Sequence, residues 1–306
     1  MRIATTSNEA SLPPADLLLG VAITTIWGTN FVVIRFGLQS FPPLAFACLR
    51  FALVFVPAML FVPRPKVGFG RLALYGAITG GGQFGLLFIA LRGFISPGLG
   101  SLVIQCQVFF TVAIAAIKGG ESLGIRQVIA AAFAVAGLSL IAFEGGGDAS
   151  LEGLVLVLLA GLAWAVANIL MRAGTPGGML AFVIWSSPFA VLPLLILSLV
   201  FEGPEKILVA STSASALAWL SVVWQATGNT LFGFAAWGRL LQRHPAFLVA
   251  PLALLVPVFG IGSSVLLVGE GLQVWKIAAT LLVIAGLGIN LFGTTSSARE
   301  ASYGPE

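Results

Sequence analysis

Charged side chains are scarce in this chain. Asp, Glu, Lys and Arg make up 8% of its 306 residues, whereas a soluble domain carries about 25%. Hydrophobic residues reach 58%, so the chain cannot cover its surface with polar groups. Its mean hydropathy of +1.06 indicates that lipid is the solvent for most of it. The composition excludes a soluble globular protein and predicts an integral membrane protein.

Residues that carry chemistry are equally few. The chain has one His, His244, and two Cys, Cys48 and Cys106, which both lie inside apolar runs where small packing residues are common. An enzyme needs clustered His, Asp, Glu or Cys to hold a metal or to form an acid–base pair, and the sequence has no such cluster. A phosphate-binding loop of the Gly-Lys-Ser/Thr kind is also missing. We therefore expect a protein that is not an enzyme, with no metal, no cofactor and no built-in ATPase.

The charges that are present stand apart from one another. Net charge is +4, but the basic residues are scattered singly between apolar runs, which excludes a nucleic-acid-binding patch. All eleven acids fall in the termini or in turns, so no carboxylate lies in mid-membrane to carry a proton or bind sodium. We expect Glu121 and Glu270 at helix starts, where a carboxylate caps free N–H groups and complements the helix dipole.

Apolar runs of about 20 residues, the length of a membrane-crossing helix, succeed one another along the chain. A lipid-exposed loop or sheet edge would leave backbone groups unpaired, and the runs do not alternate as barrel strands do, so helices are predicted. Short turns rich in Pro, Gly and charge separate them, such as residues 202–205. The ten runs are residues 17–36, 44–62, 72–91, 97–117, 125–143, 153–172, 179–200, 216–238, 246–268 and 274–293. The predicted fold class is all-α integral membrane with ten transmembrane helices.

The distribution of Lys and Arg predicts the orientation. With ten spans both termini share a side, and that side collects ten of the fifteen basic residues against four on the other, with Arg50 inside a span. We expect a multi-pass protein of the inner (plasma) membrane, with cytoplasmic tails at residues 1–15 and 294–306. The turn at residues 144–152, which has no basic residue, fits the outside.

The chain contains an internal repeat. Gly120-Glu121, the Ala-Gly-Leu at residues 136–138 and Phe143 recur 149 residues later as Gly269-Glu270, residues 285–287 and Phe292. Trp27 and Arg35 likewise recur 137 residues later as Trp164 and Arg172. Five spans per half force the second half to enter the membrane upside down, which predicts a 5+5 inverted-topology repeat of residues 16–143 and 152–293. Such repeats are typical of transporters with a site near the midplane.

Several short motifs are spread over the two halves of the chain: Trp27-Gly28-Thr29-Asn30-Phe31, Leu49-Arg50-Phe51, Val256-Pro257-Val258-Phe259, Gly269-Glu270 and the two Ala-Gly-Leu centres. With these motifs the whole chain, from about Ala15 to Phe292, resembles the EamA-type ten-helix exporters of the drug/metabolite transporter superfamily, and most of all the YddG-type amino-acid exporters. Val108 departs from the pattern, since the first half often has Pro there, and Ser187 stands opposite Arg50 in the second half. The resemblance implies a substrate site between the first and sixth spans, closed by the third, fourth, eighth and ninth.

Amides and indoles inside the spans are the candidate lining of a substrate cavity. Polar groups in a membrane span cost stability unless they are satisfied, so their presence points to a cavity or to bonds between helices. The candidate cavity residues are Trp27, Asn30, Gln83, Gln105, Trp164, Asn168, Trp224, Gln225 and Asn229. An alternative remains open, in which the amides only join helices and the Trp residues sit in the interfacial belt. Arg50 is left with three options: reaching the membrane surface, pairing with a helix C-terminus, or binding a substrate carboxylate.

A neutral cavity lined by amides and indoles predicts a secondary transporter that exports small neutral metabolites by alternating access. Amino acids, including aromatic ones and methionine, fit it best. Transporters of nucleotide sugars or sugar phosphates, and multidrug efflux pumps, are the alternatives; the former need several deep cations and the latter a cavity carboxylate. Because no acid lies in the membrane, we expect transport without obligatory proton or sodium coupling. The expected partners are the lipid bilayer and the small-molecule substrate, not nucleic acid; a monomer is compatible with the sequence, which leaves the oligomeric state open.

Overall fold

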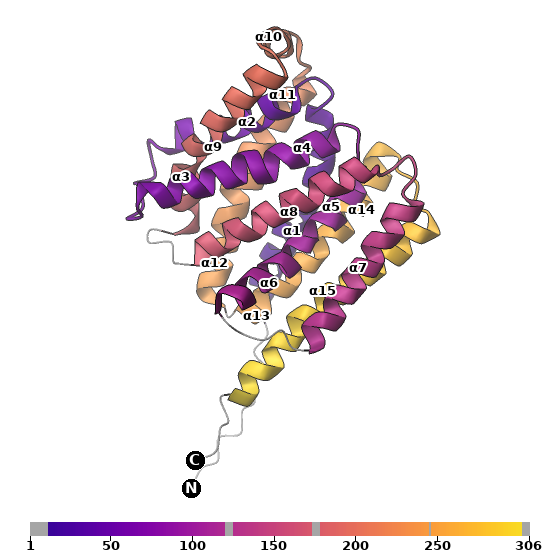
Figure 1. Cartoon of the computed structure of the whole chain (residues 1–306). Helices are drawn as coiled ribbons and strands as arrows, with labels where there is room; N and C mark the ends of the chain where they lie inside the picture. Colours follow the sequence, from indigo (N-terminus) through magenta and orange to yellow (C-terminus); the bar gives the residue numbers. More distant parts are fainter. Residues whose placement is uncertain (1–11, 120–124, 173–177, 245, 302–306) are drawn as a thin grey trace.

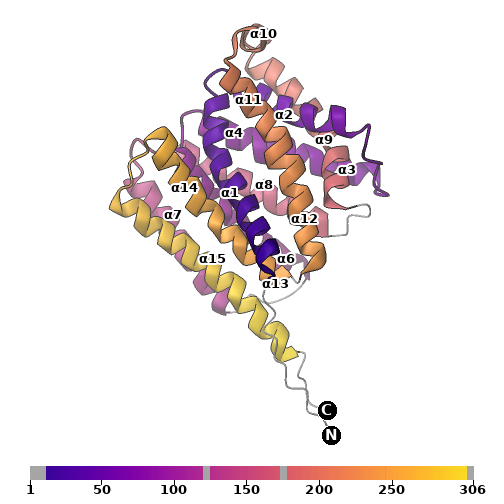
Figure 2. The same cartoon turned by 180° about the vertical axis from the view of Figure 1, so that it is seen from behind.

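The computed structural model describes residues 12–119, 125–172, 178–244 and 246–301. Within these ranges the ordered structure is helical, apart from one isolated antiparallel bridge between Ile95 and Ala149 (Figures 1 and 2). The first part of the described chain forms α1 (Pro14–Gly37), α2 (Pro43–Ala58), α3 (Phe69–Ala77), η1 (Ile78–Gly85), α4 (Leu86–Leu91), α5 (Pro97–Val103), η2 (Ile104–Cys106), α6 (Gln107–Gly119) and α7 (Ile125–Glu144).

The second part of the chain repeats this order with one extra helix. Its elements are α8 (Leu151–Arg172), α9 (Met179–Phe201), α10 (Pro204–Ser213), α11 (Ala216–Trp224), η3 (Gln225–Phe232), α12 (Gly233–Arg243), α13 (Ala246–Val249), η4 (Ala250–Leu254), α14 (Leu255–Val268) and α15 (Val274–Ala301). The short helix α10 replaces the predicted turn after residue 202. It begins with Pro204 in its first turn, where a missing N–H costs nothing, and Glu205 there complements the helix dipole.

Seven helical segments of the described chain are long and apolar enough to cross a membrane, or eight if the pair 204–213 and 216–241, bent by 103°, is one span. Two shorter apolar helices cover residues 43–58 and 274–290. The seven segments are residues 14–37, 69–91, 97–114, 125–144, 151–171, 179–201 and 250–268. The prediction of an all-helical membrane protein is confirmed.

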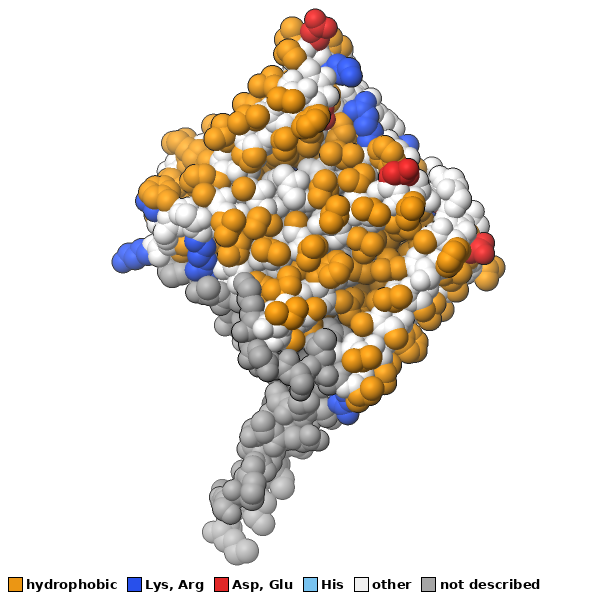
Figure 3. All heavy atoms as spheres, viewed as in Figure 1, with side chains coloured by type: hydrophobic (Ala, Val, Ile, Leu, Met, Phe, Trp, Pro, Cys, Tyr) orange, Lys and Arg blue, Asp and Glu red, His pale blue; other side chains and the backbone are white. Residues whose placement is uncertain are grey.

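The surface is that of a membrane protein. Hydrophobic side chains cover most of the face in Figure 3, and the charged side chains in that view lie toward its edges. Large apolar side chains are widely exposed, with Phe143 at 86%, Phe61 at 83% and Leu266 at 83%. A water-soluble monomer rarely exposes such a contiguous apolar surface, so a bilayer is the environment that this surface fits.

Helices from the two parts of the chain pack against each other across the molecule. α1 packs on α14, α2 on α9, α5 on α14, α6 on α8, and α7 on α15. Figures 1 and 2 show α7 and α15 side by side along one flank of the bundle. There the repeated glycines allow the contact: a Cβ on Gly137 would meet the Ala279 carbonyl oxygen at 3.0 Å, and one on Gly286 the Ala130 oxygen at 2.6 Å.

Two helices change their winding halfway along. The segment η1 between α3 and α4, and the segment η3 between α11 and α12, are both eight-residue π-helices. A π turn widens the helix by one residue and is common at functional sites. Both segments carry polar side chains of the candidate set, Gln83 in η1 and Gln225 and Asn229 in η3, so they place those groups at the centre of the bundle.

The bundle has two ends, the α10 end and the terminal end. The α10 end holds α10, the loop at residues 145–150 and the segment 269–273. The terminal end holds Pro14 at the start of α1 and the end of α15 (Figure 1).

Candidate substrate cavity

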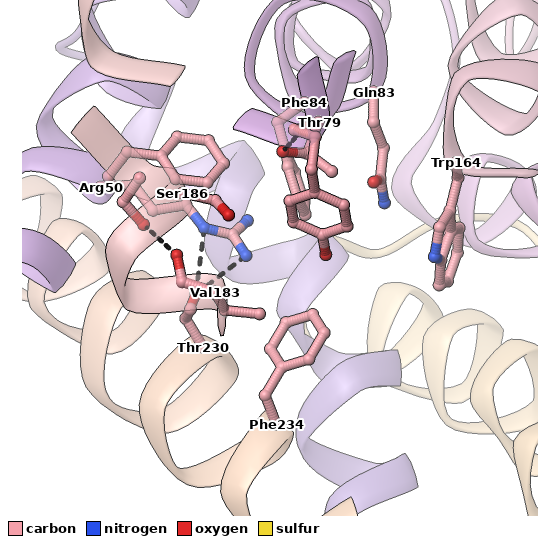
Figure 4. A pocket seen from close by; sticks show the side chains of 12 residues that line it. Arg50, Thr79, Gln83, Phe84, Trp164, Val183, Ser186, Thr230 and Phe234 are labelled. Atoms are coloured by element: carbon pink, nitrogen blue, oxygen red, sulfur yellow. Dashed lines mark hydrogen bonds between the residues drawn. The ribbon is translucent and has the colours of Figure 1, made fainter. Parts of the chain in front are cut away.

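A cavity lies where α2, α3, η1, α8, α9, η3 and α12 meet (Figure 4). Its volume is about 20 Å³, which holds about one water molecule. It is lined by Arg50, Phe51, Tyr75, Thr79, Gln83, Phe84, Trp164, Val183, Ser186, Ser187, Thr230 and Phe234. Aromatic rings and hydroxyls dominate the lining, and Arg50 is its one charged side chain. A space of this volume is too small to hold an amino acid.

Arg50 stands halfway along α2 and is completely buried, with 0% of its side chain exposed. Its Nε and Nη2 atoms donate hydrogen bonds to Thr230 Oγ1 at 3.2 and 2.9 Å, and its Nη1 donates to Gln225 Oε1 at 3.0 Å. The guanidinium carbon lies 3.7 Å from the centre of the Phe84 ring, a cation–π contact. Of the three options for Arg50, reaching the membrane surface is therefore wrong.

Gln225 connects three helical segments through its amide. Its Oε1 accepts from Arg50 on α2, and its Nε2 donates to Asn30 Oδ1 on α1 at 2.6 Å. The hydroxyl of Thr230 in turn donates to the Gln225 backbone oxygen, five residues earlier, at 2.8 Å. This bond spans the π turn, so the unusual winding of η3 holds Thr230 and Gln225 together beneath the guanidinium.

Gln83 and Trp164 form the other side of the cavity. Figure 4 shows both opposite Arg50, on η1 and α8 respectively. The Gln83 side chain is buried at 6% exposure and makes no hydrogen bond among the described residues. An amide whose polar atoms face a cavity is free to bind whatever enters it.

Trp27 does not line the cavity, although it is the repeat partner of Trp164. Its Nε1 donates to the Asn229 backbone oxygen at 3.2 Å, and its ring packs on Phe234 and Trp237 with ring centres 6.0 and 5.1 Å apart. Trp27 therefore joins α1 to η3 and α12. The Asn229 residue is itself buried in η3.

The remaining candidates lie away from the cavity. Asn168 donates to Gln107 Oε1 at 2.8 Å and joins α8 to α6. Gln105 is buried in η2, and Trp224 is 36% exposed at the end of α11. Of the nine candidates the structure thus brings four around the cavity: Gln83 and Trp164 in its lining, and Gln225 and Asn30 behind Arg50. Substrate contact by any of the nine stays a prediction.

Hydroxyl-bearing residues of the cavity were missed. Ser186 and Ser187 donate to the backbone oxygens four residues earlier, at 2.7 and 2.8 Å, as such residues do in any membrane helix. Nothing in the local sequence separates them from structural Ser. The sequence singles out only Ser187, because Ser187 occupies the position in the second half that corresponds to Arg50 in the first half.

The α10 end is held by two partly buried carboxylates that cap neighbouring helices. Glu202, at the end of α9, accepts from the Leu44 and Ala45 N–H groups of α2 at 2.7 and 2.9 Å. Glu270 accepts from the Ser96 hydroxyl at 2.5 Å and the Gly98 N–H at 3.2 Å, both at the start of α5. Each capped helix has Pro at its first position, so the carboxylate serves the next free N–H groups.

Glu270 is also the centre of an ion-pair chain. Lys276, 2% exposed, pairs with Glu270 and with Asp148 at 2.9 Å each, and the Ser264 hydroxyl donates to Glu270. Burial acts to raise the pKa of Glu270, but the hydrogen bonds from Ser264, Ser96 and Lys276 and the Lys276 charge outweigh it, so the pKa is lowered. Glu270 was expected to cap its own helix start; instead it caps α5. Glu121 lies outside the described residues.

The terminal end also has polar contacts between helices. His244 Nε2 lies 2.7 Å from Asp16 Oδ2, and Arg71 on α3 donates from Nε to the Leu170 oxygen of α8 at 2.9 Å. Among the described residues no three His, Cys, Asp or Glu side chains gather where they could hold a metal ion.

The comparison with known proteins gives consistent matches. The model of the EamA-like transporter family matches the chain twice, over residues 15–143 and 151–292. A protein of Salmonella typhimurium (strain LT2) named "Probable amino-acid metabolite efflux pump" is 39% identical over 284 residues, covering 91% of this chain and 95% of that protein. A protein of the same name from Escherichia coli (strain K12) is 37% identical over 284 residues, with the same coverage. A solved structure titled "Crystal structure of protein" superposes with a TM-score of 0.62 at 19% identity, covering 91% of this chain and 97% of that one.

Proposed function

The chain belongs to the EamA-like transporter family, and we propose that it exports amino acids from the cell by alternating access. The observation that supports this most directly is the similarity to two proteins named as probable amino-acid metabolite efflux pumps, at 39% and 37% identity over nearly their whole length. Aromatic amino acids and methionine are the proposed substrates, because rings line much of the cavity.

The proposed architecture is ten transmembrane helices in two inverted halves, residues 16–143 and 152–293. The double match of the family model supports the duplication. Pairwise features of the structure support it as well: the π segments η1 and η3 stand in the third and eighth proposed spans, and the 3₁₀ segments η2 and η4 in the fourth and ninth. In this arrangement α10 is an added surface helix between the seventh and eighth spans.

We further propose an inner-membrane location with both termini in the cytoplasm. The excess of Lys and Arg on the side of the termini supports it. In this orientation the α10 end, where Glu202 and Glu270 cap neighbouring helices, faces outward. Release of a substrate to the outside would then proceed at the end of the bundle that these caps hold together.

The cavity suits a zwitterion better than the competing substrates. Its single cation, Arg50, contrasts with the several cations that would be needed for a sugar phosphate or nucleotide sugar. It has no carboxylate in its lining to attract a hydrophobic cation, as a multidrug pump would need. Rings on several sides can pack on an apolar side chain.

Export can be tested in bacterial cells that lack their own amino-acid exporters and are fed dipeptides. Cells that express the chain should keep lower internal phenylalanine and methionine than cells with the empty vector. Unchanged amino-acid levels, together with reduced accumulation of a hydrophobic cation, would favour the multidrug alternative and refute the proposal.

A further inference from the structure

A buried positive charge without a counter-ion marks one wall of the cavity. Arg50 is fully buried, and an arginine side chain keeps its charge inside proteins. Its hydrogen-bond partners are nevertheless the neutral side chains of Thr230 and Gln225. Within the described part of the chain Arg50 forms no salt bridge. The carboxylates of Asp16, Asp148, Glu202 and Glu270 are engaged at the two ends of the bundle. A buried cation without an anion is unfavourable, and the Phe84 ring offsets only part of that cost.

The guanidinium also has donors to spare. Arginine has five N–H groups, and three hydrogen bonds from Arg50 are formed, one from each nitrogen. Two N–H groups, one on each Nη atom, therefore have no partner among the described residues. Figure 4 shows the guanidinium directed into the cavity, which it lines together with Thr230 and Ser186. Paired Nη donors are the geometry that binds a carboxylate with two parallel hydrogen bonds.

We infer that Arg50 is the carboxylate-binding group of the transport site, and that the substrate's carboxylate lies against α2 and η3 while its side chain points toward Trp164. This inference rests on the proposed function and adds the substrate class to it: the ligand must carry a carboxylate. Gln225 and Thr230 act as positioning residues, because their acceptors hold the guanidinium in place from behind. The rings of Phe84, Trp164 and Phe234 supply the apolar part of the site.

The competing interpretation is that Arg50 only ties α2 to η3. Both interpretations expect an Arg50 variant to lose stability. They differ in the response to ligands, because a purely structural Arg50 does not distinguish ligands with a carboxylate from ligands without one. Three probes share a phenyl ring and differ in their charged groups: L-phenylalanine, 3-phenylpropionate and phenethylamine.

Thermal unfolding of the purified full chain in detergent, with each probe added, tests the inference. Wild type should be stabilised by L-phenylalanine and by 3-phenylpropionate but not by phenethylamine. Arg50→Gln should lose the response to both carboxylates. Arg50→Lys keeps the charge but not the paired donors, so its affinity for them should fall about ten- to a hundredfold. Arg35→Gln is the matched control: this arginine donates to the Leu91 and Arg92 backbone oxygens outside the cavity, and its loss should leave the preference for carboxylates intact.

The outcomes separate this inference from the proposed function. Equal stabilisation of wild type by phenethylamine would overturn the carboxylate site, even if neither Arg50 variant folds. Retained affinity of Arg50→Lys or Arg50→Gln for 3-phenylpropionate would also overturn it, and would leave amino-acid export standing. Binding of 3-phenylpropionate without binding of any amino acid would support the anion site while refuting the proposed function.

Discussion

Gln225 joins two buried polar side chains, Arg50 and Asn30. Its amide oxygen accepts from Arg50, and its amide nitrogen donates to Asn30. Hydrogen bonds between membrane helices contribute about 0.6 kcal/mol on average and up to about 1.7 kcal/mol. A residue that forms two such bonds, one of them to a charge, belongs at the upper end of that range.

We therefore expect Gln225→Leu to lower the free energy of unfolding by about 1–2 kcal/mol, because Arg50 Nη1 then loses its acceptor and Asn30 Oδ1 loses its donor. Unfolding of the purified variant by denaturant in mixed micelles measures the change. Gln105→Leu is the control, since Gln105 is as deeply buried but its side chain makes no hydrogen bond in the described chain. Equal losses of unfolding free energy in Gln225→Leu and Gln105→Leu would show that the hydrogen bonds of Gln225 do not stabilise the fold.

Trp164 and Trp27 should behave differently in spite of their equivalent places in the repeat. Trp164 lines the cavity, whereas Trp27 is packed between α1, η3 and α12. Aromatic pairs contribute about 0.5–1.5 kcal/mol beyond area burial, so Trp164→Leu should weaken the apparent affinity for phenylalanine about two- to tenfold more than that for alanine. Trp27→Leu should reduce stability and affect both substrates alike. Transport assays with labelled phenylalanine and labelled alanine measure both effects. A change in substrate preference in Trp27→Leu, but not in Trp164→Leu, would contradict this assignment.

At the scale of helices, capping by carboxylates from other helices holds the α10 end together. Glu270 connects the start of α5 to Lys276 on α15 and, through it, to Asp148. The lowered pKa of Glu270 means that the folded state favours its charged form. This stabilisation is complete above the ordinary carboxyl pKa of about 4.3 and is lost as the pH falls through the lower pKa of the folded state.

At pH 7 Glu270→Gln should therefore unfold at a lower temperature than wild type. Its free energy of unfolding should fall by about 3 kcal/mol, since Lys276 loses one of its two anionic partners. The difference should shrink as the pH is lowered below about 4, where wild type loses the same charge. Melting curves between pH 3 and pH 7 measure it. Glu144→Gln, at an exposed position at the end of α7, is the control and should follow wild type. A difference that does not depend on pH would refute the charge-based account.

The helices themselves could be predicted because the bilayer fixes their length and their apolar character. Helix α10 could not be predicted, because Gly203-Pro204 is compatible with a turn as well as with the start of a helix. Tertiary packing determines which of the two forms. The candidate residues include two that line the cavity, Gln83 and Trp164, but not Thr230 and Ser186, and substrate contact by any of them stays a prediction. The hydroxyls of Thr230 and Ser186 bond to the backbone of their own helices, so their sequence context is the same inside and outside a cavity. The neutral partners of Arg50 depend on contacts 175–180 residues apart, which no local pattern encodes.

For the whole molecule, the orientation is open to a simple test. Gly147 lies in the exposed loop at the α10 end, with space around its Cα. In a background without Cys48 and Cys106, a Gly147→Cys variant should react with a membrane-impermeant thiol reagent added outside intact cells, because the distribution of Lys and Arg predicts that this loop lies outside. Labelling only after the inner side has been exposed would show the reverse orientation.

Alternating access by two inverted halves predicts exchange of substrate through one central site without a coupled ion, because no described carboxylate lies in the cavity lining. The most direct measurement is counterflow of labelled phenylalanine into proteoliposomes loaded with unlabelled phenylalanine. Labelled phenylalanine should accumulate transiently, and a proton ionophore should not abolish the accumulation. No counterflow with any amino acid by correctly folded protein would contradict the account, and counterflow that vanishes when the pH gradient is collapsed would contradict its uncoupled mechanism.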